Sequence, residues 1–108
     1  MSISAPITFN QLYDKIVLFE KEVTGELNSF WELIKIRPEK WLEPVYEKDG
    51  DGFWVVAICG KRIIWYNDFE DGFSASKYKE YKLLDEYGES RGELKSAVET
   101  LYDLIHKQ

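Results

Sequence analysis

The residues best suited to chemistry in this chain form one short stretch that is both acidic and aromatic. Its carboxylates, Asp68, Glu70 and Asp71, stand close together in the sequence. Two neighbouring carboxylates can do acid–base work, and an acidic loop beside aromatic rings can grip a basic protein. The simpler interpretation is a solvated turn, because Asp, Asn and Gly are ordinary loop residues. As candidate partner-binding residues we take Trp65, Tyr66, Asp68, Phe69, Glu70, Asp71 and Phe73.

The four tryptophans offer a second kind of site. Indole rings stack on sugars and line apolar pockets. Trp54 and Trp65 stand on the two runs of a predicted hairpin, and they are the candidate ligand-binding residues. Core packing is the competing interpretation, because tryptophan is strongly buried on average.

Other patterns that would indicate catalysis or metal binding are incomplete. Residues 47–52 resemble the start of an EF-hand calcium loop, but Ile58 stands where the loop needs a bidentate Glu. The chain has one cysteine, Cys59, and one histidine, His106, which is too few for the usual zinc site. No glycine-rich phosphate loop is present in the sequence. We therefore predict no catalytic residue, no metal site and no cofactor.

A hairpin over residues 53–68 is the clearest element that could position these residues. Two β-branched and aromatic runs flank Gly60-Lys61, and glycine at the first loop position suits a type II′ turn, which needs φ > 0 there. Counting outward from this turn predicts one face made of Trp54, Val56, Ile58, Ile63 and Trp65. It predicts another made of Phe53, Val55, Ala57, Ile64 and Tyr66.

Both faces of this hairpin are apolar, whereas a half-exposed antiparallel sheet alternates apolar and polar residues. Terminal helices can cover one face. The other must be covered by a loop such as residues 38–46, by a second copy of the chain in a homodimer, or by a partner. The sequence leaves these three alternatives open.

Two amphipathic helices flank the hairpin in the sequence. Thr8 and Gln11 have the spacing of a capping box, and apolar residues then recur at helical spacing as far as Val23. Ser90 and Glu93 form a second such box before a helix near the C-terminus. The apolar face of that second helix comprises Leu94, Ala97, Val98, Leu101, Leu104 and Ile105.

The remaining segments give weaker signals. Residues 26–37 fit a helix or a strand, and the approach to Pro38 favours a strand over residues 30–37. Residues 38–41 are expected to form a helical turn and residues 68–76 a loop, while residues 78–87 alternate like a half-buried strand. Residues 1–108 are thus predicted to form a single α+β domain. Its antiparallel sheet has about four strands, with an N-terminal and a C-terminal helix packed on one face.

Composition narrows the classes of function. A chain of 108 residues with 44% hydrophobic residues can build one core. A net charge of −6 argues against a nucleic-acid backbone or an anionic membrane as partner, and it favours a basic protein. The N-terminal residues lack a signal-peptide pattern, and no apolar run approaches the ~20 residues of a membrane span. A cytoplasmic location is therefore expected.

The acidic and aromatic stretch Trp65–Phe73, with the size and acidity of the chain, resembles small bacterial immunity-type proteins, which neutralise a toxin by covering its active site. The resemblance implies a non-enzymatic protein-interaction domain, and specifically an inhibitor of a basic partner. The alternative is a small-molecule or carbohydrate binder that uses Trp54 and Trp65. An enzyme with two carboxylates ranks last, because no nucleophile, metal set or phosphate loop accompanies them.

Overall fold

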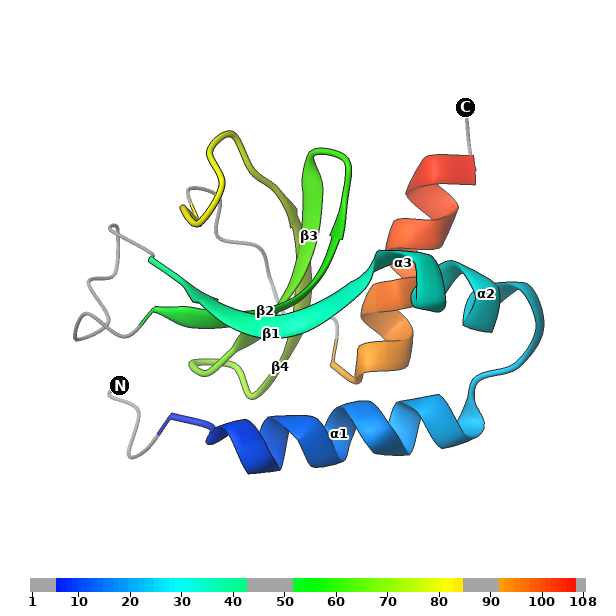
Figure 1. Cartoon of the computed structure of the whole chain (residues 1–108), viewed down its shortest axis with the longest axis horizontal. Coiled ribbons are helices and arrows are strands. Elements are labelled where there is room, and N and C mark those ends of the chain that lie inside the picture. Colours follow the sequence, from blue (N-terminus) through cyan, green and yellow to red (C-terminus); the bar gives the residue numbers. More distant parts are fainter. Residues whose placement is uncertain (1–5, 43–51, 85–91, 107–108) are drawn as a thin grey trace.

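The computed structural model describes residues 6–42, 52–84 and 92–106. These residues form an antiparallel sheet in the order β1-β2-β3-β4, with three helices packed against one face (Figure 1). The predicted α+β class and the expected helices from both ends of the chain are confirmed. The elements are α1 (Phe9–Glu22), α2 (Gly25–Ile34), β1 (Lys35–Trp41), β2 (Phe53–Cys59), β3 (Arg62–Asn67), β4 (Gly72–Lys77) and α3 (Leu94–His106).

The β2–β3 hairpin forms with the predicted turn but with one change of register. Gly60 has φ +61, as the first position of a type II′ turn requires, and Cys59 pairs with Arg62. A β-bulge then makes Val55, rather than Val56, the partner of Trp65. A bulge places two consecutive residues of one strand opposite a single residue of the other. Val56 and Ala57 therefore both join the helix-side core.

Because of this bulge, the predicted composition of the two hairpin faces is wrong at several residues. The helix-covered face carries Trp54, Val56, Ala57, Ile64 and Tyr66, which belong to one hydrophobic cluster with the helices. The opposite face carries Phe53, Val55, Ile58, Ile63 and Trp65, which belong to a second cluster. Both faces are apolar, as the sequence indicates.

The chain itself covers much of the second face. Tyr78 begins a segment, residues 78–84, that crosses this face and brings Leu84 into complete burial beside Trp41. The Tyr78 amide donates to the Lys61 carbonyl over 2.9 Å, and the Leu84 amide donates to the Leu42 carbonyl over 2.7 Å. Residues 43–46 of the loop proposed as a cover lie outside the described residues.

Of the half-buried strand predicted over residues 78–87, residues 78–84 form no strand, and residues 85–87 lie outside the described part of the chain. Residues 78–84 are an irregular segment with one isolated bridge, Leu42 to Leu83, and Lys82 has φ +75. The fourth strand is instead β4 (Gly72–Lys77), which overlaps most of the predicted loop 68–76. Its small residues Ser74 and Ser76 are buried by pairing with β3.

The ambiguous segment before the hairpin is helical through Ile34. The strand predicted over residues 30–37 therefore begins five residues later than predicted, at Lys35. The spacing of Phe30, Trp31 and Ile34 reflects their burial against the sheet. β1 follows α2 directly, with Lys35 serving both as the helix C-cap and as the first strand residue. Pro38 lies inside this edge strand, at a register irregularity, rather than in a helical turn. Proline is tolerated there because an edge strand has one unpaired side.

The N-terminal cap of α1 is present as predicted. The Thr8 hydroxyl accepts from the Gln11 amide over 3.1 Å, and the Gln11 side chain accepts from the Thr8 amide over 3.0 Å. α1 buries Leu12, Ile16 and Phe19. The predicted Ser90 cap of the last helix lies outside the described residues.

Candidate functional site

The predicted acidic loop is a four-residue turn, Asp68–Asp71, between β3 and β4. The side chain of the preceding residue, Asn67, folds over the turn: its Oδ1 accepts from the Phe69 amide at 3.0 Å and from the Glu70 amide at 3.2 Å. Asp71 closes the turn with φ +52, a conformation that Asp and Asn adopt more readily than most residues. Two amides of the turn are thus hydrogen-bonded to Asn67, through its side chain and, for Glu70, also through its carbonyl.

The carboxylates of this turn have different surroundings. Asp68 is half-buried and accepts from the Ile7 amide over 2.9 Å. Glu70 and Asp71 are exposed, and Asp71 accepts a hydrogen bond from the Tyr66 hydroxyl. Burial, the hydrogen bond to Asp71 and the charges of Asp71 and Asp68 raise the pKa of Tyr66 well above its usual value. The hydroxyl therefore stays protonated and fixes the orientation of the Asp71 carboxylate.

The candidate aromatic residues divide into core and surface. Trp65, Tyr66 and Phe73 are at most 3% exposed and therefore cannot form the contact surface for a partner. Phe69 is 39% exposed, and its ring lies 5.8 Å from that of Phe53. Of the seven predicted residues, Phe69, Glu70 and Asp71 are exposed at the turn, with Asp68 partly so.

The first turns of α1, which follow Ile7 in the chain, expose two aromatic residues. Phe9 is 39% exposed and Tyr13 is 52% exposed, with their rings 6.0 Å apart. Ile7 connects these rings to the turn. Its amide donates to the Asp68 carboxylate, and its carbonyl accepts from Trp54 Nε1 at 3.4 Å. The centroids of the Trp54 and Phe9 rings lie 5.6 Å apart. We call the set the acidic–aromatic surface: Phe9, Tyr13, Phe69, Glu70 and Asp71.

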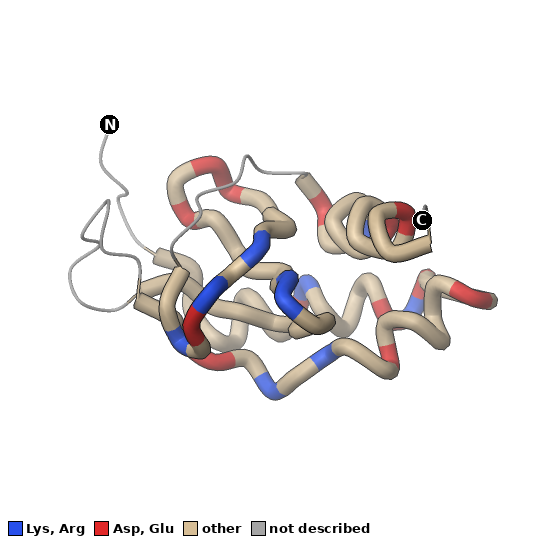
Figure 2. Tube along the Cα trace, turned by 90° about the horizontal axis from the view of Figure 1, so that it is seen from above, with Lys and Arg blue, Asp and Glu red and all other residues tan. Residues whose placement is uncertain are grey.

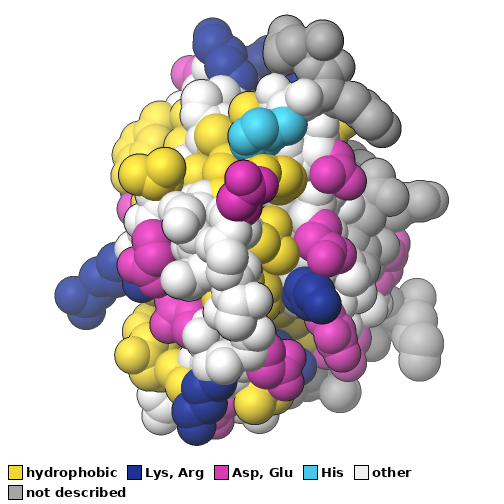
Figure 3. Space-filling view, turned by 90° about the vertical axis from the view of Figure 1, so that its right-hand side faces the viewer, with side chains coloured by type: hydrophobic (Ala, Val, Ile, Leu, Met, Phe, Trp, Pro, Cys, Tyr) yellow, Lys and Arg dark blue, Asp and Glu magenta, His cyan; other side chains and the backbone are white. Residues whose placement is uncertain are grey.

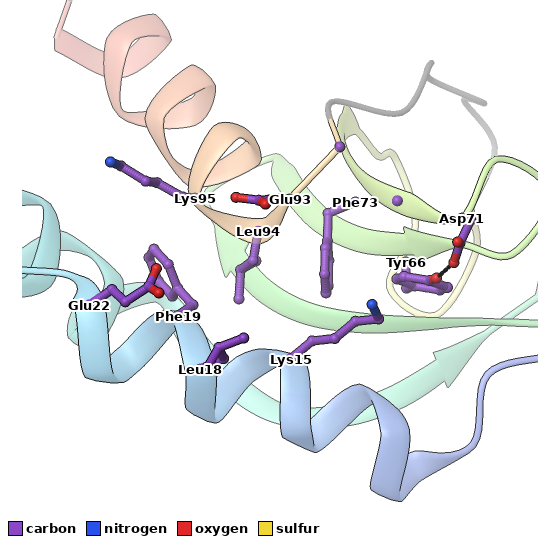
Figure 4. A pocket seen from close by; sticks show the side chains of 12 residues that line it. Lys15, Leu18, Phe19, Glu22, Tyr66, Asp71, Phe73, Glu93, Leu94 and Lys95 are labelled. Carbon is purple, nitrogen blue, oxygen red and sulfur yellow. Dashed lines mark hydrogen bonds between the residues drawn. The ribbon is translucent and has the colours of Figure 1, made fainter.

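A pocket of about 330 Å³ opens beside this surface, between α1, the β3–β4 turn and the start of α3. Figure 4 shows Lys15 and Glu22 projecting from α1 on one side, and Tyr66 with Asp71 at one end. Phe19, Phe73 and Leu94 provide apolar wall. Lys15 Nζ lies 6.0 Å from the centroid of the Tyr66 ring. No local sequence pattern indicates this pocket, because its walls come from three segments far apart in the chain.

The alternative ligand-binding pair is not brought together. Trp54 is half-buried on the helix side of the sheet, and Trp65 is fully buried on the opposite side. Trp65 Nε1 donates to Ser76 Oγ over 3.0 Å, so its polar atom is used within the core. Trp31 and Trp41 are buried as well.

Charge is unevenly distributed over the described residues (Figure 2). Acidic residues occupy the β3–β4 turn, and they also gather at the end of the molecule formed by α2 and α3, where His106 lies (Figure 3). At that end the Tyr102 hydroxyl donates to Glu26 over 2.7 Å. Basic residues are concentrated on β1, at the β2–β3 turn, and at the end of β4 with the segment that follows it. They comprise Lys35, Arg37, Lys40, Lys61, Arg62, Lys77, Lys79 and Lys82.

The residues considered for catalysis or metal binding are dispersed. Cys59 is partly buried beside the β2–β3 turn, and His106 is an exposed residue of the last turn of α3. In the calcium-loop pattern, residues 47–51 lie outside the described residues. Gly52 has φ +75 and packs so closely on the Trp41 backbone that a Cβ atom would not fit. Within residues 6–42, 52–84 and 92–106, no three His, Cys, Asp or Glu side chains gather to hold a metal ion. No helix in these ranges could span a bilayer.

Comparison of the chain with protein-family models, with curated protein sequences and with solved structures finds no match. The geometry of the site therefore carries the functional argument.

Proposed function

We propose that this chain is a non-enzymatic, cytoplasmic protein-interaction domain that binds a basic protein through the acidic–aromatic surface. The observation that carries the proposal is the exposure of Phe69 next to Glu70 and Asp71 on a hydrogen-bonded turn. An aromatic anchor beside charged groups is the combination that dominates many binding energies. A turn that is already ordered also loses little conformational entropy on binding.

The other exposed aromatics enlarge this surface. Phe9 and Tyr13, near the start of α1, offer a partner two further exposed rings. The carboxylates would act mainly on the rate of encounter, because charges at the rim of an interface steer association more than they tighten it. The net charge of −6 favours a basic partner in the same way.

The specific form of the proposal is an immunity-type inhibitor that covers the active site of a basic toxin. Its support is the match in charge between an acidic surface and a partner that itself binds anionic substrates. If a neighbouring gene encodes a toxin, co-expression of this chain should restore growth, and the Glu70→Lys variant should restore it less well. Equal growth with and without this chain would contradict the inhibitor form.

Site-specific crosslinking tests the interaction surface. A photo-reactive phenylalanine analogue is placed at Phe69 or, as a matched control, at Leu104, which is 44% exposed on α3. Illumination in the native cell should give a discrete crosslinked band from position 69 and none from position 104. Mass spectrometry should identify a protein of basic isoelectric point in that band. Equal crosslinking from both positions, or none from position 69, would overturn the proposal.

A further inference from the structure

The pocket beside the β3–β4 turn contains charged groups that lack ion-pair partners within the described part of the chain. Glu22 and Glu93 face it from α1 and from the residue preceding α3, and neither forms an ion pair there. Asp71 adds a third carboxylate, held by the Tyr66 hydroxyl. Lys15 and Lys95 are the cations on the same walls, so carboxylates outnumber ammonium groups.

Between these charges the pocket is lined by apolar side chains. Phe19, Phe73 and Leu94, which are buried residues of the helix-side core, line its inner wall, and Leu18 of α1, which is 60% exposed, supplies accessible apolar surface (Figure 4). An occupant must therefore combine an apolar stem with a cationic head. Arginine has both: a hydrocarbon stem that packs on apolar surface and a planar guanidinium that pairs with carboxylates and stacks on rings.

We propose that this pocket is the anchor site for an arginine side chain of the basic partner. The inference rests on the proposed function, since it specifies the partner's chemistry at a place next to the acidic–aromatic surface. The stem lies against Leu18, which is 60% exposed, and the guanidinium pairs with the Asp71 carboxylate. A volume of about 330 Å³ is at the small end of ligand sites and suits one long side chain.

Lys15 gives the proposal a distinctive consequence. Its ammonium group lies over the Tyr66 ring, close to the carboxylate that an arginine would use. Lys15 therefore opposes an incoming cation, because it repels the positive charge and competes for the same carboxylate. Replacing it by methionine keeps the hydrocarbon stem and removes the charge, so Lys15→Met should tighten binding of a cation and weaken binding of an anion.

The test uses the full chain and N-acetyl-arginine amide as the probe, followed by amide chemical shifts in NMR spectra. Shifts should change at Tyr66, Asp71, Phe73 and Leu94, with a dissociation constant on the order of millimolar for so small a ligand. N-acetyl-norleucine amide has a similar stem without the charge and should bind at least fivefold more weakly. Asp71→Asn should weaken binding about fivefold and is tolerated by the positive φ of this position. Glu99→Gln, on the outer face of α3, is the matched control and should have no effect.

Each alternative outcome contradicts the proposal. An absence of shifts at these amides, equal binding of the norleucine analogue, or weaker binding after Lys15→Met would overturn it. The spectra also report whether each variant is folded. Crosslinking from Phe69 does not require the pocket, so a retained crosslink with no arginine response removes the anchor and leaves the interaction surface standing.

Discussion

Glu39 is the residue that ties the edge strand to the segment crossing the second face of the sheet. Its Oε2 accepts from Trp41 Nε1 at 2.9 Å, and its Oε1 accepts from the Tyr81 hydroxyl at 3.0 Å. Lys82 Nζ lies 3.6 Å from Oε1. Burial raises the pKa of Glu39, but the hydrogen bonds from Trp41 and Tyr81 and the charge of Lys82 lower it more, so the net pKa lies below its ordinary 4.5.

This lowered pKa predicts a pH dependence of stability. A carboxyl whose pKa is lower in the folded state contributes stability above its unfolded pKa, and that contribution is lost as pH falls through the folded pKa. Glu39→Gln should cost about 1 kcal/mol at pH 7, and this cost should shrink as the pH falls toward 3 and the native carboxyl takes up its proton. Urea unfolding at both pH values measures the difference, and an equal cost at both would contradict the role of the charge.

At the scale of the elements, the β-bulge in β2 decides which residues reach each core. Val56 and Ala57 both face the helices, whereas Val55 and Ile58 on either side face the opposite cluster. A one-residue change of length in a strand moves every side chain beyond it to the other face.

Inserting an alanine between Val55 and Val56 should therefore be far more damaging than truncating Val56. Val56→Ala should cost about 2 kcal/mol, since only buried methyl groups are lost. The insertion should instead turn Phe53 and Val55 toward the helices and abolish cooperative folding. Thermal unfolding followed by circular dichroism distinguishes the two, and an insertion variant that melts like Val56→Ala would show that β2 tolerates the extra residue.

The elements also show what the sequence could and could not reveal. The Thr8 cap and the Gly60 turn are correct because each depends on chemistry within a few residues. The bulge at Val56 was not predicted, because it depends on side-chain packing on both faces of the sheet. β4 was missed because Ser74 and Ser76 have weak strand preference and owe their conformation to pairing with β3. The turn at Phe69 follows from local residue types, but the pocket beside it depends on contacts between distant segments that no local pattern encodes.

At the scale of the whole molecule, the acidic residues of the described ranges include those of the β3–β4 turn and those of the α2–α3 end. Net charge alone would steer a basic partner to either. The proposed function requires the turn, because its carboxylates stand next to the exposed Phe69.

Matched charge reversals separate these cases. Glu70→Lys and Glu99→Lys change the net charge equally, and both residues are exposed. Once the partner is identified, Glu70→Lys should slow association severalfold at low salt, Glu99→Lys much less, and the difference should shrink at high salt. Stopped-flow association measures these rates. Equal slowing by both variants would assign the effect to net charge and not to the turn.

The direct passage from α2 into β1 limits how this chain can change in length. No loop stands between Ile34 and Lys35 to absorb an extra residue. An insertion there would rotate Glu39 and Trp41 away from their present partners. We expect descendants of this fold to keep the spacing from Trp31 to Trp41 constant, and to accumulate their insertions and deletions elsewhere along the chain.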